Sequence, residues 1–391
     1  MDSGLQVVLE GLLLLSHHDP HQRIVGLSMI DDHEIILNCL DDLEDAVVLH
    51  ALTRLKQCIL DTCVDAAALV HNRLTSVITD PCYSVSVRIS CIDALKALIN
   101  AHDVRIPTRG NKRLHDLVFI DICDLAICDF EPDIRRAGFE LIADLKQVDN
   151  LLLKQAFAKG RIDDLADLVP DSACGLFVHG MEDEYERVRV ACMRAMDAHL
   201  PRDVLNPLII DPLIDGFNDD SGMVRLQSVK LLTKIAKQYS ISLEEENAEA
   251  LASLLVDDER VVRTSVHELI AIVRLGSVAC LNAIFRWFTR TVLFYPKEHG
   301  DLVRLAYNLG ITHPLFVCEM IPTWLRLEKY YKPPELRVED ANYLLVLSCI
   351  FGAYSVNPNM VGDCLPSHIT SKHYWYIRGL YPDVIPSITF P

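Results

Sequence analysis

Histidines crowd the start of the sequence, and histidine is the side chain best suited to bind metal ions or move protons near neutral pH. Four of them, His17, His18, His21 and His33, lie close together. A metal site would need a third ligand at a familiar spacing, and none follows. Pro20 interrupts any helix that would align His17 with His21. We interpret the cluster as a polar turn between helices, and the sequence predicts no metal ion or other cofactor.

Catalytic motifs are missing from the sequence. It contains no glycine-rich phosphate loop, no G-x-S-x-G nucleophile turn and no H-E-x-x-H zinc motif, and the pair His267-Glu268 lacks the second histidine. The 13 cysteines include no C-x-x-C pair and no paired framework, which indicates free thiols in a reducing compartment. The sequence therefore predicts a protein that is not an enzyme.

One polar pattern does recur: an aspartate followed six residues later by an arginine, which a valine or isoleucine precedes. Looser copies at Arg88 and Arg304 have Cys82 and Glu298 in place of the aspartate. Charge-assisted hydrogen bonds between such residues can fix how successive repeats stack, so we interpret the pairs as a ladder between repeats, not as a catalytic dyad. The four full copies are Asp129 and Arg135, Asp183 and Arg189, Asp219 and Arg225, and Asp257 and Arg263.

Each copy lies in a short polar turn between two apolar segments with helical periodicity. In the second copy, Val188, Ala191, Cys192 and Met196 share one helical face, and Asp183 lies where it could cap the exposed N–H groups of the second helix. Successive arginines are spaced near the 40–47 residues typical of HEAT and armadillo repeats. We therefore predict an all-α fold, a HEAT/armadillo-type right-handed α-solenoid of helix pairs.

Length and composition agree with a folded chain of many stacked units. The chain has 391 residues, of which 50% are hydrophobic, and a net charge of −18, which disfavours non-specific binding to nucleic acid. The uncharged run 341–356 is too short for a membrane span. We expect capping helices over 1–75, regular repeats over 76–275 and looser helices with a tail over 276–391. An insertion near 146–170 should hold a helix at 151–157 and a loop at 159–170.

Positive charge is concentrated in one segment, residues 105–115. Pro107 and Gly110 predict that this segment is a loop. It could contact an acidic protein partner, a phosphate-bearing ligand or RNA, or it could be an ordinary solvated loop. The candidate partner-binding residues are Arg105, Arg109, Lys112 and Arg113.

The string ACGLFVHGMEDE at 173–184, with Val188 and Arg189 following, resembles the Integrator complex subunit 4 family. Residues 217–229 and 373–380 resemble it too. The resemblance implies a nuclear, non-catalytic scaffold that binds a metallo-β-lactamase-like RNA endonuclease and its inactive partner. These subunits process small nuclear RNA 3′ ends and cleave nascent RNA polymerase II transcripts. From the basic segment and the short apolar run we also expect an indirect or local RNA contact and no membrane association. Family members continue into a strand-rich portion that is missing here, so we expect a short form.

The repeat pattern alone is equally compatible with a generic HEAT-repeat adaptor in transport or membrane traffic. A HEAT metalloenzyme similar to deoxyhypusine hydroxylase would need His-Glu pairs at matching positions in several repeats. The repeats contain only His267-Glu268, which argues against it.

Overall fold

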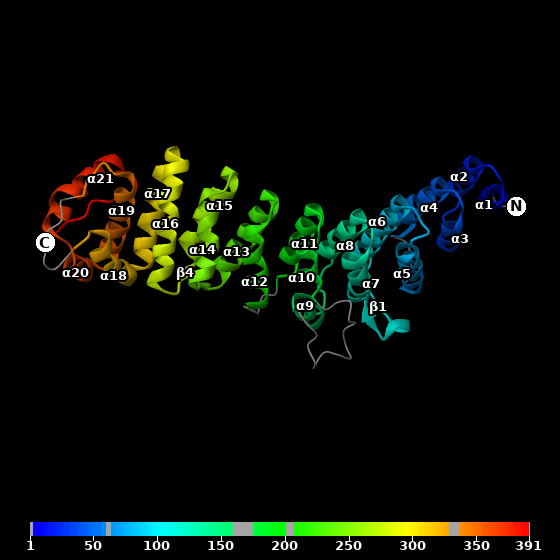
Figure 1. Cartoon of the computed structure of the whole chain (residues 1–391). Coiled ribbons are helices and arrows are strands. Elements are labelled where there is room, and N and C mark those ends of the chain that lie inside the picture. The colour runs from blue at the N-terminus through cyan, green and yellow to red at the C-terminus, as the bar shows by residue number, and fades with distance from the viewer. Residues whose placement is uncertain (1–2, 60–63, 159–174, 201–206, 328–335, 391) are drawn as a thin grey trace. The chain divides into compact units, whose positions relative to one another are not determined.

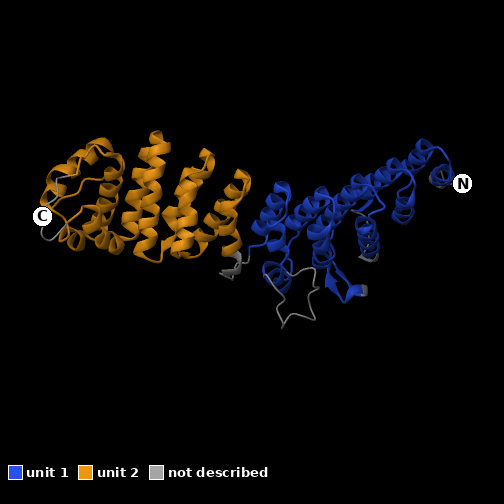
Figure 2. Ribbon diagram, in the orientation of Figure 1, with its two compact units in different colours: residues 1–208 blue, residues 209–391 orange. Residues whose placement is uncertain are grey.

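The chain forms two compact units, Met1–Leu208 and Ile209–Pro391 (Figure 2). This computed structural model describes residues 3–59, 64–158, 175–200, 207–327 and 336–390. Stacked helix pairs make up both units (Figure 1), so the predicted all-α solenoid of the HEAT/armadillo type is confirmed. The division at 75/76 and 275/276 describes how regular the repeats are, and it stays a prediction.

Unit 1 has two layers of helices. The second helices of successive pairs, α4, α6, α8 and α11, pack on one another in order, and the first helices α5, α7 and α10 form the other layer. Its elements are α1 (Ser3–Leu15), α2 (Pro20–Ser28), α3 (His33–Asn38), η1 (Cys39–Asp41), α4 (Asp45–Cys58), α5 (Val64–Thr79), α6 (Val85–Ala101), β1 (Arg105–Ile106), η3 (Pro107–Arg109), β2 (Lys112–Arg113), α7 (Leu114–Cys128), α8 (Pro132–Asp144), α9 (Asn150–Phe157), α10 (Leu176–Met181) and α11 (Glu186–Ala198).

Unit 2 repeats this arrangement, with α13, α15, α17 and α19 stacked in one layer and α14, α16 and α18 in the other. Its elements are α12 (Pro207–Asp215), η6 (Gly216–Asn218), α13 (Gly222–Gln238), β3 (Ser242–Leu243), α14 (Glu245–Ser253), η7 (Leu254–Val256), α15 (Arg260–Ile272), β4 (Arg274–Leu275), α16 (Val278–Phe294), η8 (Pro296–Glu298), α17 (His299–Thr312), α18 (Pro314–Trp324), α19 (Ala341–Val356), α20 (Pro358–Gly362), the π-helical turn η9 (Ile369–His373) and α21 (Tyr374–Leu380).

Apolar residues at helical spacing form the core between the layers. On α11 the predicted face, Val188, Ala191, Cys192 and Met196, is buried. The predicted extra helix at 151–157 is α9, whereas the loop predicted at 159–170 lies outside the described residues. Burial of such a face, rather than helix propensity, supplies most of the stability of helices this short.

Helices α17 and α19 approach each other through two glycines. A Cβ atom on Gly310 of α17 would lie 2.0 Å from the carbonyl oxygen of Cys349 on α19. A Cβ atom on Gly352 of α19 would lie 2.1 Å from the carbonyl oxygen of Tyr307 on α17. Only hydrogen atoms fit at these two positions, so the glycines set the distance between the helices.

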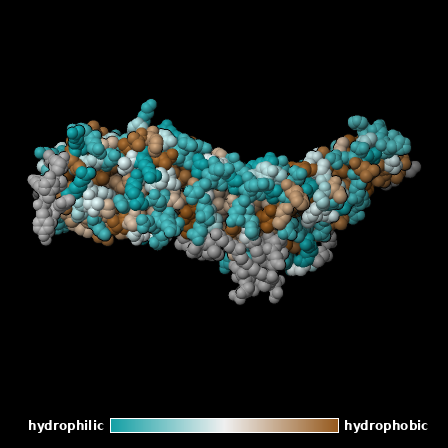
Figure 3. All heavy atoms as spheres, in the orientation of Figure 1, coloured by the Kyte–Doolittle hydropathy of each residue, from teal (hydrophilic) through white to brown (hydrophobic). Residues whose placement is uncertain are grey.

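Hydrophilic residues cover much of the face drawn in Figure 3, with hydrophobic residues showing between them. Across the described ranges, none of the helices combines the length and apolar character that a membrane crossing would require.

Candidate functional site

A repeated arginine contact joins successive turns within each unit. In unit 1, Arg135 of α8 donates to both carboxylate oxygens of Asp183 in the following turn, from Nε at 2.6 Å and from Nη2 at 3.0 Å. Its Nη1 donates to the carbonyl oxygens of Asp129 (2.6 Å) and Phe130 (3.4 Å) in its own turn. One guanidinium group therefore fixes the shape of its own turn and the position of the next.

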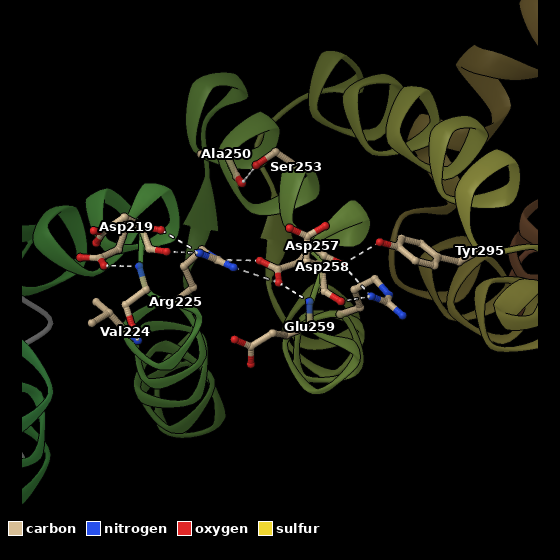
Figure 4. Close-up of polar contacts among 12 residues, drawn as sticks. Asp219, Val224, Arg225, Ala250, Ser253, Asp257, Asp258, Glu259 and Tyr295 are labelled. Atoms are coloured by element: carbon tan, nitrogen blue, oxygen red, sulfur yellow. Dashed lines mark hydrogen bonds and ion pairs between the residues drawn. The ribbon is translucent and has the colours of Figure 1, made fainter. Parts of the chain in front are cut away.

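Unit 2 contains the same contact (Figure 4). Arg225 donates to the carboxylate of Asp257 at 2.6 and 3.1 Å, and to the carbonyl oxygens of Asp219 and Asp220 at 2.9 and 3.2 Å. The Asp257 side chain is 2% exposed, so its charge depends on Arg225 for compensation. The hydrogen bonds that Arg225 donates to Asp257 raise the pKa of the Arg225 guanidinium above its ordinary value.

The next contact in unit 2 uses a glutamate. Arg263 donates to both carboxylate oxygens of Glu298, at 3.0 and 2.6 Å, and its Nη1 donates to the carbonyl oxygens of Asp257 and Asp258 at 2.6 and 3.2 Å. The ring of Tyr295 lies 3.7 Å from the guanidinium carbon. Glu298 stands where the other repeats have an aspartate. Its longer side chain still accepts both hydrogen bonds from the arginine of the preceding repeat, Arg263.

The ladder aspartates do not cap helices, which corrects the expectation for Asp183. Its Oδ1 accepts from the N–H of Tyr185 (2.9 Å), which is itself the N-cap residue of α11. Asp129, Asp219 and Asp257 likewise accept from the N–H two residues ahead, at 2.8–2.9 Å. An aspartate whose side chain bonds to the backbone two residues on forms an Asx turn. Each aspartate thus orders the turn before the helix.

Arg189 makes the same contacts within its own turn, donating Nη1 to the carbonyl oxygens of Asp183 (2.9 Å) and Glu184 (3.3 Å). The four predicted ladder aspartates thus lie in the turns between paired helices, and the four arginines lie near the start of the helices that follow. That the ladder stabilises the fold stays a prediction, for which the Discussion gives a test.

A further copy near the N-terminus was missed in the sequence. Arg23 of α2 donates to both carboxylate oxygens of Asp42 (2.7 and 2.8 Å) and to the carbonyl oxygens of His17 and His18 (2.9 and 3.0 Å). His17 takes the aspartate's part, because its Nδ1 accepts from the N–H of Asp19 (3.0 Å). This copy was not recognised because a histidine replaces the aspartate and because no valine or isoleucine precedes Arg23. In the described part of the chain, no three His, Cys, Asp or Glu residues could jointly hold a metal ion.

Arg88 shows how the contact adapts to a longer turn. It donates to the carboxylate of Asp129, as the ladder requires, but its Nε donates to the carbonyl oxygen of Ile78 (2.6 Å). The turn between α5 and α6 spans residues 80–84, whereas the turn between α7 and α8 spans 129–131. The Arg88 guanidinium therefore donates to a carbonyl oxygen ten residues before it in the sequence, whereas the other ladder arginines donate to one six residues before them.

Buried or half-buried histidines lie at the opposite ends of the second helices. His102, which follows α6, donates Nε2 to the carbonyl oxygen of Ile59 (2.7 Å), and His199, which follows α11, donates to that of Ile142 (2.6 Å). His313 occupies the equivalent position after α17. Burial lowers the pKa of His199 and of His313. These residues carried no recognised motif, and the sequence did not reveal them.

Acidification is expected to destabilise the fold through these histidines. Because burial lowers the folded-state pKa of His199, the unfolded chain binds a proton that the folded chain does not. Stability is therefore complete above the unfolded pKa of about 6.5 and is lost as the pH falls below it. Between about pH 7.5 and about pH 5.5, the melting temperature should fall less for His199→Gln than for the unchanged chain. The exposed His18→Gln should leave the loss unaltered, and an equal loss in all three proteins would contradict the assignment.

The basic segment is a β-hairpin and not the predicted loop. Strands β1 and β2 pair antiparallel, with Arg105 opposite Arg113 and Ile106 opposite Lys112. Gly110 and Asn111 have positive φ angles of 73° and 54°, as a tight reversal requires. Buried Ile106 anchors the hairpin on the helices. The alternation of buried and exposed residues over two-residue strands is too short to be recognised in the sequence.

The four candidate residues of the hairpin differ in accessibility. Arg109 donates to both carboxylate oxygens of Asp121 on α7, at 2.9 and 3.3 Å. Burial raises the pKa of Asp121, but hydrogen bonds from His71 and Arg109 outweigh burial and leave that pKa below its ordinary value. Arg109 therefore holds the hairpin on the helices. Arg105 and Lys112 are exposed, and half-buried Arg113 donates to the side chain of Gln147 (3.0 Å).

Comparisons with known proteins identify relatives along most of the chain. Integrator complex subunit 4 of Xenopus laevis is 26% identical over 364 residues, which cover 82% of this chain and 37% of that protein. The Homo sapiens protein of that name is 25% identical over 411 residues, 94% of this chain and 42% of that protein. The protein SIEL of Arabidopsis thaliana is 22% identical, over 53% of this chain and 23% of its own length. The chain thus spans about two fifths of the length of its Integrator relatives. No protein-family model matches it.

Solved structures of solenoid proteins align with the chain at low identity. A mutant of Kap121p has a TM-score of 0.44 at 15% identity, over 99% of this chain and 44% of that chain. Computationally designed armadillo repeat proteins for modular peptide recognition have a TM-score of 0.38 at 16% identity, over 64% of this chain and 99% of that chain. The fold assignment rests on the chain's own helix pairs.

Proposed function

We propose that this chain, as a member of the Integrator complex subunit 4 family, is a non-catalytic scaffold subunit of an Integrator complex in the nucleus. The observation that carries the proposal is the extent of the likeness, which runs over 94% of the chain and so includes repeats of both units. A scaffold needs a rigid frame with a long accessible surface. The turn ladders within each unit support this proposal, because their arginines contact both their own turn and the next one.

The partners we propose are the metallo-β-lactamase-like endonuclease and its inactive partner. The complex would process small nuclear RNA 3′ ends and cleave nascent RNA polymerase II transcripts. Protein–protein contact with this pair is the chain's own part in that activity. Any contact with RNA would be local or made through the partners, because the net charge of −18 opposes phosphate binding over most of the surface.

Co-expression tests the proposal directly. The tagged full chain is produced with the two metallo-β-lactamase-like subunits, purified from nuclear extract at moderate salt and passed over a sizing column. Stoichiometric co-elution of all three proteins is expected. Recovery of vesicle-coat or transport proteins without the nuclease pair would instead support the adaptor function.

The hairpin is the contact we propose within this scaffold. Changing Arg105, Lys112 and Arg113 together to Glu should weaken binding of the nuclease pair by roughly tenfold or more, because charge reversal at an interface introduces repulsion. Arg109 is left unchanged, because its loss would leave the largely buried Asp121 carboxylate without its arginine partner. Pull-down titration against the purified pair measures the effect.

The matched control reverses three exposed cations of unit 2, Lys230, Lys234 and Arg304, which gives the same change in net charge. Equal melting temperatures would show that both variants remain folded. If both bind as the unchanged chain does, the hairpin is an ordinary solvated surface and the scaffold proposal itself is untouched. If both bind equally weakly, net charge, and not the hairpin, sets the affinity.

A further inference from the structure

Two large apolar side chains in unit 1 are almost completely exposed. Leu43 is 98% exposed and Phe130 is 97% exposed, more than any other large apolar residue among those described. Both occupy the same place in their repeats, directly after the ladder aspartates Asp42 and Asp129. Scattered exposed leucines are normal on a protein surface, but the same exposed position in two repeats indicates a shared surface.

The turns that carry these side chains are held rigidly. The carbonyl oxygens of Asp129 and Phe130 accept from Arg135, and the Asp129 carboxylate accepts from the N–H of Glu131 at 2.9 Å. An apolar side chain on a fixed turn loses little backbone freedom on binding. Such preorganisation favours affinity at an anchor point.

The turn before α4 is held in the same way. The Asp42 carboxylate accepts from Arg23 and from the N–H of Glu44, the latter at 2.9 Å. Leu43 therefore projects from a turn that is fixed from both sides, as Phe130 does.

Aromatic residues continue the row on the neighbouring turns. The hydroxyl group of Tyr83, in the turn before α6, donates to Asp41 (3.4 Å), which places that turn beside the turn of Leu43. The ring of Tyr185 lies 5.6 Å from the guanidinium carbon of Arg135, which places it beside the turn of Phe130, and Tyr185 is 42% exposed. These four side chains therefore lie on four successive turns of unit 1, those before α4, α6, α8 and α11.

Carboxylates surround this row. They outnumber the cations at these turns, where Arg73 pairs with Asp41 and Arg187 pairs with Asp133. A segment that seats apolar groups here would gain from lysine or arginine on either side and would be repelled if it were acidic. The exposed carboxylates are those of Glu44, Asp45, Glu131, Glu182, Glu184 and Glu186.

We propose that this turn edge of unit 1, defined by Leu43, Tyr83, Phe130 and Tyr185, docks a partner protein segment in which apolar side chains alternate with lysine or arginine. Unit 2 provides the contrast. There the residues after the ladder aspartates are Asp220 and Asp258, and Figure 4 shows Asp258 following Asp257. Within the described residues, apolar anchors follow the ladder aspartates at two turns of unit 1, whereas Glu184 follows Asp183 at the third.

Fluorescence anisotropy of labelled peptides with the full chain tests the proposal. The first peptide alternates Leu and Phe with Lys and Arg, the second replaces its cations by Glu, and the third replaces its apolar residues by Ser. The first peptide should bind, and the other two should bind at least roughly tenfold more weakly. Equal binding of the second or third peptide, or no binding of the first, would overturn the proposal.

Variants assign the binding to the turn edge. The double change Leu43→Ser and Phe130→Ser should weaken binding of the first peptide by roughly tenfold, because each removes an apolar anchor. Both side chains are exposed, so the melting temperature should stay unchanged. The matched control is Leu293→Ser with Leu315→Ser, whose side chains in unit 2 are 76% and 67% exposed. A control that loses as much affinity as the test variant would place the binding elsewhere. This outcome is independent of whether the nuclease pair binds the chain.

Discussion

Replacing Asp257 by alanine is expected to lower the free energy of unfolding by about 3–5 kcal/mol, the usual effect of removing one partner of a buried ion pair. The Asp257 carboxylate accepts two hydrogen bonds from Arg225, at 2.6 and 3.1 Å, and one from the N–H of Glu259 at 2.8 Å. With alanine, the largely buried guanidinium keeps its charge and loses its counter-ion. Denaturant unfolding of the whole chain, followed by circular dichroism, measures the change.

The neighbouring residue supplies the control. Asp258 is exposed and contributes only its backbone carbonyl to the contact with Arg263, so Asp258→Ala should change stability by no more than about 0.5 kcal/mol. Asp257→Asn should be intermediate, because the amide oxygen can still accept from Glu259 while the charge is lost. If Asp257→Ala unfolds at the same denaturant concentration as Asp258→Ala, the ladder does not hold the repeats together.

Replacing Gly352 by alanine is expected to destabilise unit 2 by about 1–3 kcal/mol or more, as overpacking of a close contact does. The added methyl group would lie 2.1 Å from the carbonyl oxygen of Tyr307, which is backbone and cannot rotate away. Helices α17 and α19 must then separate along their contact. Gly310→Ala should have a similar effect for the reciprocal reason.

Gly379 provides the matched control because it also lies in a helix, α21, and a Cβ atom there would meet nothing within 4 Å. Gly379→Ala should leave stability unchanged or raise it by about 0.5–1 kcal/mol through the better helix propensity of alanine. Thermal melts of the three variants decide the matter. Equal melting temperatures for Gly352→Ala and Gly379→Ala would show that the helix contact adjusts without cost.

The architecture was predictable because helix periodicity and the recurring Asp and Arg are local signals. The partners of the ladder were harder to foresee. The six-residue spacing relates Arg135 to the backbone carbonyl of Asp129, whereas its side-chain partner Asp183 lies 48 residues away. A spacing within one repeat says nothing of which residue the next repeat places opposite.

Two causes explain the remaining differences between the expectations from the sequence and the structure: other residue types replace the aspartate, and the fold partly buries residues that were expected to be accessible. His17 accepts from a backbone N–H in the turn as a ladder aspartate does, and a search for aspartate could not find it. Glu298 was recognised only as part of a looser copy, and its pairing with Arg263 was not predicted. Nothing in the sequence distinguishes Arg109 from the other three candidate cations, whereas in the structure it forms an ion pair with Asp121. The closeness of α17 and α19 depends on a long-range contact that single glycines do not reveal. The partners of Glu298 and Arg109 and the contact of α17 with α19 all involve residues that are distant in the sequence.

The ladder also has a consequence for how such chains change in length. Arg135, Arg225 and Arg263 each contact their own turn and the following one, so these repeats end in the turn with which the next repeat begins. The side chains that meet lie 48 residues apart at Arg135 and Asp183 but 32 apart at Arg225 and Asp257, and the contact is the same. Duplication or deletion of one whole repeat bounded by such contacts would therefore leave their arginines and carboxylates paired. Insertions within a repeat are tolerated for the same reason, whereas a point change at the turn itself has no such compensation.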